Sequence, residues 1–336
     1  MQTTRRTLLK AAASITLVGL GSKTASAQSG TYNQKVATNV ANSHPIYVRL
    51  KEAADKIKTE SDGKVNISVF PNGQLGSDTD MLSQVRSGGV DYLTVPGVVL
   101  ANLVPLASLN SVGFAFTDYP TVWKAMDGKT GDVIRAAIVK SNLTVFDKVW
   151  DNGFRQITSF KPITQASDLA GLKIRVPVSP ILLSIFKSLG SSPTPINFNE
   201  LYSALQTKVV EAQENPLALI NNSKLYEVQK NCALTGHVWD GYWFVANKRV
   251  LEGMPAPLQE IVTRNFNAAG VLQRADSEKL AVQLQQDLAT KGLTFNKPST
   301  DSFRKTLQQA GFYAEWKTKF GDEAWAALEM YTGKLA

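Results

Sequence analysis

The chain has 336 residues, 43% of them hydrophobic and 19% charged, a length that suits one large domain or two medium domains with cores of their own. Its formal net charge at pH 7 is +8, but the basic residues form no long block, so the sequence does not indicate nucleic-acid binding. The only cysteine, Cys232, excludes an internal disulfide, and we interpret it as a small core residue.

Residues 1–27 have the pattern of an export signal. Arg5 and Arg6 precede an apolar stretch that ends at Leu20, and Ala25-Ser26-Ala27 matches a cleavage site. The order Thr-Arg-Arg-Thr-Leu-Leu-Lys resembles a twin-arginine signal, and an ordinary secretory signal is the alternative. No later apolar stretch reaches the roughly 18 residues that cross a bilayer. We therefore predict cleavage after Ala27 and export to the periplasm.

Predicted strands and helices alternate in the first part of the exported chain. Strand patterns cover residues 34–40, 65–69 and 90–95, and helix patterns cover residues 46–60 and 78–88. We interpret Asp78 and Asp80 as caps of the second helix, with ligand contact as the alternative. The order strand, helix, strand, helix, strand predicts a parallel sheet with helices on both faces.

A second unit of strands and helices is predicted after a helix at residues 121–140. Apolar residues alternate with Lys173 and Arg175 up to Pro177, which indicates a short strand. From about residue 255 the chain is predicted to be helical, and residues 256–291 form a run long enough to brace two lobes. The other predicted elements of this unit include a strand at Arg155, a helical turn at 167–168, helices at 179–189 and 199–206, a strand at 209–213 and a helix that ends at residue 227. The chain then crosses over through residues 232–238 and 239–246.

Arg175 is predicted to lie at the carboxyl end of its strand. In open α/β sheets this edge faces the ligand crevice, and the planar guanidinium of arginine matches a carboxylate with two parallel hydrogen bonds. Arg155 would add a second positive charge to the same place if the two strands are neighbours. The alternative is that both arginines are surface or ion-paired residues without a ligand.

Seven short stretches carry a further signal through their order and spacing. They are residues 61–76, 153–162, 168–177 and 200–206, Gln213-Glu214-Asn215-Pro216, residues 224–228 and Thr235-Gly236-His237. Each stretch alone is weak evidence for a family, but together they extend across nearly the whole exported chain. Taken together they resemble the solute-binding proteins of TRAP transporters, the tripartite ATP-independent periplasmic uptake systems of bacteria.

The resemblance implies an α/β, two-lobed periplasmic binding protein fold of type II-like topology. Each lobe would have a mainly parallel sheet with helices on both faces, and a long helix would bridge the lobes. Lobe 1 is expected to comprise residues 28–152 plus about 241–280. Lobe 2 is expected to comprise residues 153–240 plus about 281–336, including the C-terminal helices.

The resemblance also implies a function without catalysis. Arg175 resembles the arginine that pairs with the ligand carboxylate, Arg155 the second arginine of that pocket, and Asn215 the asparagine that binds the same end of the ligand. The expected partners are a small organic acid, enclosed between the lobes, and the membrane permease subunits of a TRAP transporter. No cofactor, metal or catalytic residue is expected.

Four further residues are candidates for ligand contacts. His44 follows the first predicted strand, and Thr94 ends the third, so both are expected near the ligand edge of lobe 1. Trp239 and Asp240 belong to an aromatic cluster in which we assign Trp243 to the core. An aromatic wall would suit an aromatic acid or a sugar face, and an aspartate would suit hydroxyl groups.

Two other functions remain as alternatives: an exported enzyme acting on an organic acid, and a ligand-binding subunit of a sensor. The sequence contains no G-x-S-x-G elbow and no glycine-rich phosphate loop, which disfavours the enzyme. It has two histidines and one cysteine, which gives a zinc site no support. We interpret the second histidine, His237, as a structural residue.

Overall fold

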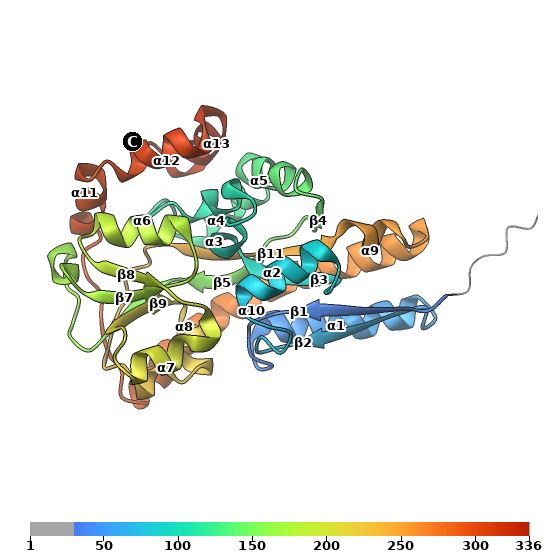
Figure 1. Cartoon of the computed structure of the whole chain (residues 1–336), viewed down its shortest axis with the longest axis horizontal. Coiled ribbons are helices and arrows are strands. Elements are labelled where there is room, and N and C mark those ends of the chain that lie inside the picture. Colours follow the sequence, from blue (N-terminus) through green and yellow to red (C-terminus); the bar gives the residue numbers. More distant parts are fainter. Residues whose placement is uncertain (1–29, 336) are drawn as a thin grey trace, which may run out of the picture. The chain divides into compact units, whose positions relative to one another are not determined.

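The computed structural model describes residues 30–335, which form two six-stranded sheets with helices around them (Figure 1). The predicted export signal and its cleavage site lie outside the described residues. No helix within residues 30–335 combines the length and apolar character that crossing a bilayer requires.

The first sheet contains the three strands predicted at the start of the exported chain. Its members are β1 (Tyr32–Ala37), β2 (Val65–Phe70), β3 (Tyr92–Pro96), β4 (Leu143–Val145), β5 (Trp150–Phe154) and β11 (Trp239–Asn247). The strand order is β2-β1-β3-β11-β4, and β5 also pairs with β11. The predicted parallel pairing of β1 with β2 and β3 is confirmed, while β11 runs antiparallel to its three neighbours.

The second sheet contains the strand of Arg175. Its members are β6 (Gln156–Ser159), β7 (Lys173–Val176), β8 (Ser192–Pro195), β9 (Ala212–Asn215), β10 (Asn231–Ala233) and β12 (Thr294–Asn296). The strand order is β12-β10-β6-β9-β7-β8. Strand β7 lies parallel to β8 and β9, and β6 lies antiparallel to β9 and β10.

The chain crosses between the two sheets at two places that lie side by side. Arg155 alone separates β5 from β6, and residues 234–238 separate β10 from β11. The Arg155 amide donates to the carbonyl of Val238 at 2.8 Å, so the two crossings are hydrogen-bonded to each other. Because the chain crosses once in each direction, the crossing strands pair antiparallel, and each sheet is mixed rather than mainly parallel.

Helix α1 (Pro45–Glu60) illustrates how local sequence forms the elements around the first sheet. His44 is its N-cap, and Pro45 occupies the first turn, where a missing amide hydrogen costs nothing. Its buried face includes Ile46, Leu50, Ala53 and Ile57, at the spacing of an amphipathic helix. The other helical elements on this side are α2 (Asp78–Ser87), α3 (Gly97–Leu100), η1 (Pro105–Ser111), α4 (Tyr119–Met126), α5 (Lys129–Val139) and α9 (Lys248–Glu252).

The single helix predicted at residues 121–140 is wrong, because the chain forms α4 and α5 with a break at Gly128. A Cβ atom at Gly128 would lie 2.3 Å from the hydroxyl of Tyr331 and 2.6 Å from the carbonyl oxygen of Lys124. The position therefore requires glycine because the backbone carbonyl of Lys124 and the hydroxyl of Tyr331 both approach it closely. The helical elements beside the second sheet are η2 (Ala166–Leu169), α6 (Pro180–Ser188), η3 (Phe198–Glu200), α7 (Leu201–Gln206), α8 (Leu217–Asn222) and η4 (Leu225–Glu227).

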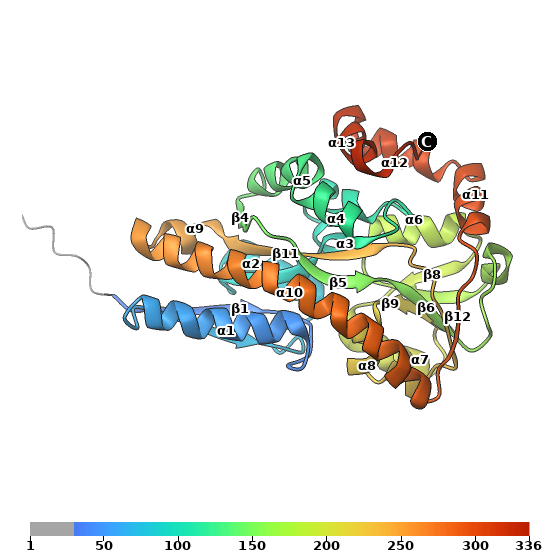
Figure 2. The ribbon, with the colours of Figure 1, turned by 180° about the vertical axis from the view of Figure 1, so that it is seen from behind.

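The predicted long helix is confirmed as α10 (Ala256–Thr290), 35 residues without interruption. At 1.5 Å per residue it is about 52 Å long. Val262 and Phe266 pack with residues of the first sheet, and Leu284 and Leu288 pack with residues around α7 and α8. Figure 2 shows α10 running past both sheets. This one helix therefore connects the two halves of the molecule, the half around the first sheet and the half around the second.

The C-terminal helices contact both halves of the molecule. They are α11 (Asp301–Gln309), α12 (Phe312–Phe320) and α13 (Asp322–Thr332). Helices α11 and α12 contact α6, while α13 packs against α4 and α5, where the Thr130 hydroxyl donates to the carbonyl of Ala327 at 2.8 Å. The residue limits of the two lobes stay a prediction.

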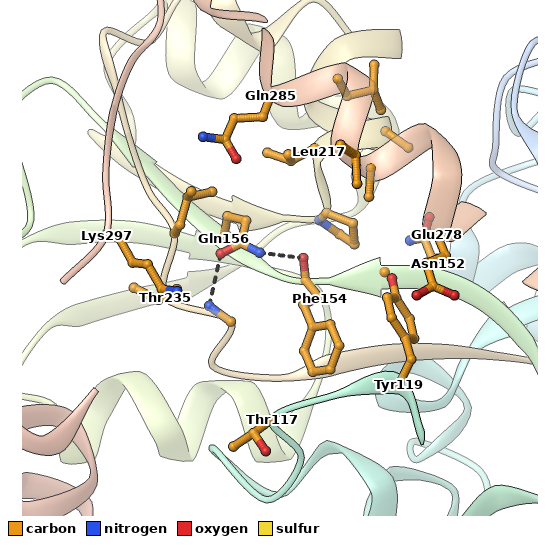
Figure 3. Close-up of a pocket in the computed structure, with 18 of the residues that line it drawn as sticks. Thr117, Tyr119, Asn152, Phe154, Gln156, Leu217, Thr235, Glu278, Gln285 and Lys297 are labelled. Atoms are coloured by element: carbon orange, nitrogen blue, oxygen red, sulfur yellow. Dashed lines mark hydrogen bonds between the residues drawn. The ribbon is translucent and has the colours of Figure 1, made fainter. Parts of the chain in front are cut away.

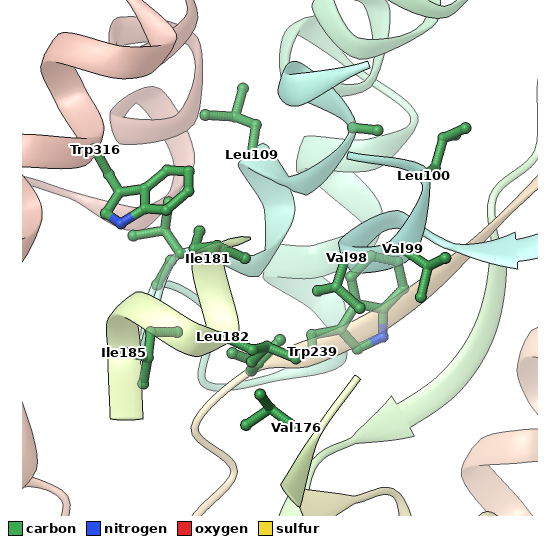
Figure 4. Close-up of a cluster of buried hydrophobic side chains, with 14 of the residues drawn as sticks. Val98, Val99, Leu100, Leu109, Val176, Ile181, Leu182, Ile185, Trp239 and Trp316 are labelled. Carbon is green, nitrogen blue, oxygen red and sulfur yellow. The ribbon is translucent and has the colours of Figure 1, made fainter. Parts of the chain in front are cut away.

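The largest hydrophobic cluster joins side chains from both halves. Figure 4 shows Val98 and Leu109 from the first half beside Ile181 and Leu182 from α6, with Trp316 of α12 next to them. Trp239, at the start of β11, belongs to the same cluster. On this side, apolar side chains therefore surround the chain where it crosses between the sheets.

Candidate functional site

A cavity of about 320 Å³ lies between loops of the first sheet and helices of the second. One wall is formed by the residues after β1 and β2 and by the start of α2. The opposite wall is formed by η3, α7 and the end of α8. Its lining residues are Asn39, Ala41, Asn72, Gly73, Gly76, Ser77, Asp78, Phe198, Asn199, Tyr202, Leu219, Asn222 and Ser223.

Hydrogen bonds join the two walls beside this cavity. Thr79 of α2 and Asn197, which precedes η3, are within 3.4 Å through their side chains. The Ser43 hydroxyl donates to Asn222 at 3.3 Å. These contacts are possible only while the two walls are close together.

Arg175 is a buried cation next to this cavity, at the carboxyl end of β7 as predicted. Its guanidinium lies 6.0 Å from the ring centroid of Phe198, which lines the cavity. The structure shows one hydrogen bond from this side chain, from Nε to the carbonyl of Ile196 at 2.9 Å, and within residues 30–335 no carboxylate forms an ion pair with it. Burial lowers the pKa of Arg175 to about 10, against the opposing charges of Glu214 and Asp78.

Asp78 lies on the opposite wall and is 7% exposed. The prediction that it caps α2 is wrong: Ser77 is the N-cap and forms a capping box with Asp80, whose interpretation as a cap is confirmed. The Asp78 carboxylate instead accepts a hydrogen bond from Asn39 at 2.8 Å. Burial raises its pKa to about 6, although the charge of Arg175 acts in the other direction.

Arg155 occupies a different environment from Arg175. Its guanidinium pairs with the Glu214 carboxylate through Nε and Nη2 and with Asp240 through Nη1 at 2.7 Å. All three side chains are at most 2% exposed. Burial acts against the Glu214 carboxylate, but Arg155 and His237 outweigh it and hold its pKa below the usual value. Arg155 is thus neutralised within the protein, as the ion-paired alternative anticipated.

The buried ion pairs continue into the first sheet through amide and imidazole groups. Asp240 accepts from the Asn152 side chain at 2.7 Å, and the Oδ1 atom of Asn152 lies 3.0 Å from His44 Nε2. His44 Nδ1 accepts from the Ile46 amide, so Nε2 carries the proton and donates to Asn152. Burial lowers the pKa of His44 to about 4, which keeps it neutral. His44 is a buried connector and helix cap, and it does not line the cavity.

Asn215 and His237 complete this network on the side of the second sheet. Asn215 accepts from Arg155 Nη2 at 3.1 Å and donates to Gln213 at 2.6 Å. His237 contacts the Glu214 carboxylate through Nε2 at 3.1 Å and the Thr235 hydroxyl through Nδ1 at 2.7 Å. The side chains therefore link the crossing strands to the end of β9, beside the strand that carries Arg175.

The remaining predicted site residues pack in the interior. Thr94 donates to the Thr38 hydroxyl at 2.8 Å. Trp239 donates from Nε1 to Asp151 at 2.8 Å and packs edge-on against Trp123. Trp243 is fully buried, which confirms its assignment to the core.

Among the seven predicted site residues, the structure groups Arg155, Asn215, Asp240 and His44 in one buried network and places Arg175 beside the cavity. Sequence reasoning missed Glu214 as the acid that pairs with Arg155. The only signal for it was its place in the polar corner Gln213-Glu214-Asn215-Pro216.

A larger cavity, about 810 Å³, lies on the other face of the crossing strands (Figure 3). Phe154 and Gln156 line it, whereas Arg155 between them points into the ion-pair network. Tyr119, Glu278 and Lys297 also line it. Among residues 30–335, no three metal-ligating side chains are grouped as a metal site would need.

The chain matches one family of bacterial proteins over most of its length. A family model described as bacterial extracellular solute-binding protein, family 7, matches residues 36–317. The chain belongs to this family. A solute-binding protein of Roseobacter denitrificans is 31% identical to it over 90% of the chain and 93% of the relative. The 2,3-diketo-L-gulonate-binding periplasmic protein of Escherichia coli is 33% identical over 72% of the chain and 73% of the relative.

Solved structures of TRAP solute-binding proteins have the same fold as this family 7 protein. The sugar acid binding protein of Advenella mimigardefordensis, in complex with galactonate, has a TM-score of 0.86 and 28% identity and covers 91% of the chain and 99% of its own. A protein of Polaromonas, bound to D-erythronate, has a TM-score of 0.85 and 29% identity over 90% of the chain and 100% of its own. The predicted resemblance and two-lobed fold are confirmed, and the family is one of binding proteins rather than enzymes.

Proposed function

We propose that this solute-binding protein captures a small organic acid between its two halves in the periplasm and delivers it to a TRAP-type membrane permease. The observation that carries the proposal is Arg175, a buried guanidinium beside the inter-sheet cavity that has one hydrogen bond and no ion-pair partner within the described residues. A carboxylate at this position would satisfy the remaining N–H donors with charge-assisted bonds.

The expected cycle needs no chemical step. When the two walls are apart, water solvates Arg175, and keeping it charged is inexpensive. When they close around a carboxylate, water leaves and the ion pair strengthens because the local dielectric constant falls. The solute then favours the closed arrangement through contacts that exist only there. A permease could recognise that arrangement.

Two kinds of comparison support an organic acid as the solute. The relative from Escherichia coli is named for binding 2,3-diketo-L-gulonate, and the structural neighbours hold galactonate and D-erythronate. Each of these compounds carries a carboxylate. Arg175 is the group with which we expect this chain to bind the same functional group, and Asn215 supports it through the adjacent network.

The test is a thermal-shift screen of the exported chain against organic acids. A ligand at about 100 times its dissociation constant should stabilise the protein by roughly 2.7 kcal/mol. Arg175→Ala should abolish the response to the best acid. Lys173→Ala is the matched control, because Lys173 is an exposed cation two residues earlier on the same strand. An unchanged response of Arg175→Ala would refute the proposal that Arg175 binds the carboxylate of the acid.

Delivery to a permease requires a separate measurement. Uptake of the labelled acid by cells should depend on both this protein and the membrane subunits, and fractionation should recover the protein from the periplasm. Uptake that persists without the protein would contradict the transport role, even if the acid binds.

A further inference from the structure

The second sheet ends in a row of exposed residues on the side away from the cavity. Strand register aligns the residues that flank neighbouring strands here: Lys230 before β10, Phe160 after β6, Glu211 before β9 and Lys173 at the start of β7. The Glu211 amide donates to the carbonyl of Lys173 at 2.8 Å, and the Lys230 amide donates to that of Ser159 at 3.2 Å. Figure 1 shows this end of the second sheet facing away from the first sheet.

Two further lysines extend this row. Lys161 directly follows Phe160, and Lys208 lies in the turn between α7 and β9. All four lysines at this end, Lys161, Lys173, Lys208 and Lys230, are exposed, and within residues 30–335 none of their ammonium groups forms an ion pair. Four positive charges therefore face water at one end of the sheet without a partner.

The acidic residues of these segments offset this charge only in part. Glu211 lies in the row itself, and Asp168 lies in η2. The Asp168 carboxylate already accepts three hydrogen bonds from the residues just before it. The segments that form this end, residues 160–173, 206–211 and 228–230, contain four lysines and two acidic residues, which gives a formal net charge of +2 (4 − 2).

Two exposed apolar side chains lie among these lysines. Phe160 is 40% exposed and Val209 is 59% exposed, and Phe160 is the only aromatic residue among the exposed large hydrophobic residues of the described chain. Each of them is followed or preceded directly by a lysine, Lys161 or Lys208. A lysine stem can lie along apolar surface while its ammonium group stays in water. This end of the sheet therefore combines apolar contact area with positive charge.

Such a combination fits the interfacial region of a membrane. Lysines attract anionic head groups without a fixed geometry, and an aromatic ring is favourable where apolar chains meet water. An acidic protein surface would instead need carboxylates matched to the four ammonium groups, and no side chain of the described residues holds these groups in a fixed position. We propose that the surface of an anionic phospholipid bilayer binds to Phe160, Lys161, Lys173, Lys208, Val209 and Lys230, which we call the basic end.

Membrane contact through the basic end leaves the solute cavity accessible. Strand β7 begins with Lys173 at the basic end and runs toward the cavity beside Arg175. A protein adsorbed in this way stays near the membrane subunits of the proposed transporter and can still bind solute. The contact itself requires neither the solute nor a permease, so it is tested apart from the proposed function.

The first measurement is cosedimentation of the exported chain, without solute, with two kinds of vesicle. One kind contains equal parts of phosphatidylglycerol and phosphatidylcholine, and the other contains phosphatidylcholine alone. We expect binding to the anionic vesicles only. The protein should be released at about 0.5 M salt, because the Debye length then falls to about 4 Å and the lysines are screened from the head groups.

Lys161→Gln/Lys208→Gln removes two charges from the basic end. Because one lysine near an anionic surface changes the partition coefficient roughly fivefold, the double variant should bind anionic vesicles at least about tenfold more weakly. Lys58→Gln/Lys64→Gln is the matched control, because it removes the same charge from exposed positions on the first half. It should change binding less than about twofold, since those positions lie beyond the screening distance.

A fluorescent label tests whether the basic end itself enters the interface. Cys232 is buried, so Phe160→Cys provides one accessible thiol for an environment-sensitive dye. The emission of the dye should shift to the blue on anionic vesicles. The same dye at Val271→Cys, an exposed apolar position on α10, should show no shift.

Three results would overturn the proposal. They are binding to anionic vesicles that is absent or no stronger than to neutral ones, equal losses of binding in the two double variants, and a blue shift at position 271 instead of position 160. Binding only to vesicles that contain permease subunits would also overturn it, because the partner would then be a protein instead of the lipid.

Discussion

The two buried arginines differ in what surrounds them, and this difference is why we propose a structural role for one and a ligand-binding role for the other. Arg155 is enclosed by two carboxylates and an amide, and these groups come from β9 and β11. Arg175 has a carbonyl and an aromatic ring as its nearest described partners. The same side chain therefore stabilises the crossing strands at one position and is held charged at a cost at the other.

This contrast predicts opposite effects of the two arginines on the stability of the solute-free protein. Arg155→Ala should destabilise it by about 3–5 kcal/mol, because two buried carboxylates lose their cation. Arg175→Met should unfold at the same or a higher denaturant concentration, because it removes a buried charge without an ion-pair partner. Urea unfolding without ligand measures both. A loss of stability in Arg175→Met as large as that in Arg155→Ala would show that Arg175 is structural.

Strand β5 is the element on which the long helix and the crossing strands converge. The Asp151 amide donates to Gln273 of α10 at 2.8 Å, and its carboxylate accepts from Trp239 at 2.8 Å and from the Gly153 amide at 2.9 Å. Gly270 of α10 lies where an added Cβ atom would be 3.1 Å from Trp150 Nε1. This glycine therefore allows α10 to approach β5 closely.

The burial of Asp151 in β5 predicts that the stability of the protein depends on pH. Burial raises the pKa of Asp151 to about 7, against the hydrogen bonds from Trp239 and Gly153. The folded state thus favours the protonated form of Asp151. The stabilisation that comes from this protonation is complete below the unfolded pKa near 4 and is lost as the pH rises through 7. Asp151→Asn cannot titrate. Its unfolding free energy relative to wild type should therefore increase between about pH 4 and pH 8.

The measurement is chemical unfolding of both proteins across this range. Asp301→Asn, at an exposed position, should follow the wild-type profile throughout. A constant difference between Asp151→Asn and wild type would mean that Asp151 does not titrate as its burial requires.

On the scale of the whole molecule, α10 and the paired crossings join the two halves, while few polar contacts close the cavity on its open side. The contacts of Thr79 with Asn197 and of Ser43 with Asn222 are neutral hydrogen bonds between different halves. Separating the walls would break these bonds without disturbing either sheet.

This arrangement predicts that Thr79→Val accelerates release of a bound acid. The loss of one neutral hydrogen bond, worth about 0.5–1.5 kcal/mol, corresponds to roughly a 2- to 10-fold weaker affinity. The ranking of acids should stay the same. Stopped-flow dissociation measures the effect, and Thr59→Val, an exposed change on α1, is the control. An unchanged dissociation rate would indicate that this contact does not hold the walls together.

Features that depend on neighbouring residues could be predicted from the chain before its fold was known. Alternation around Arg175, the proline at the start of α1 and the unbroken run of α10 follow from local geometry, so the elements and the position of Arg175 at a strand end could be predicted. The seven short stretches, through their order and spacing, added the resemblance to the family. The folded chain was needed to show that Arg155 meets Glu214 and Asp240, which lie 59 and 85 residues away, and that Asp78 lines the cavity instead of capping a helix. Such pairings depend on how the strands cross and stack, which no local pattern encodes.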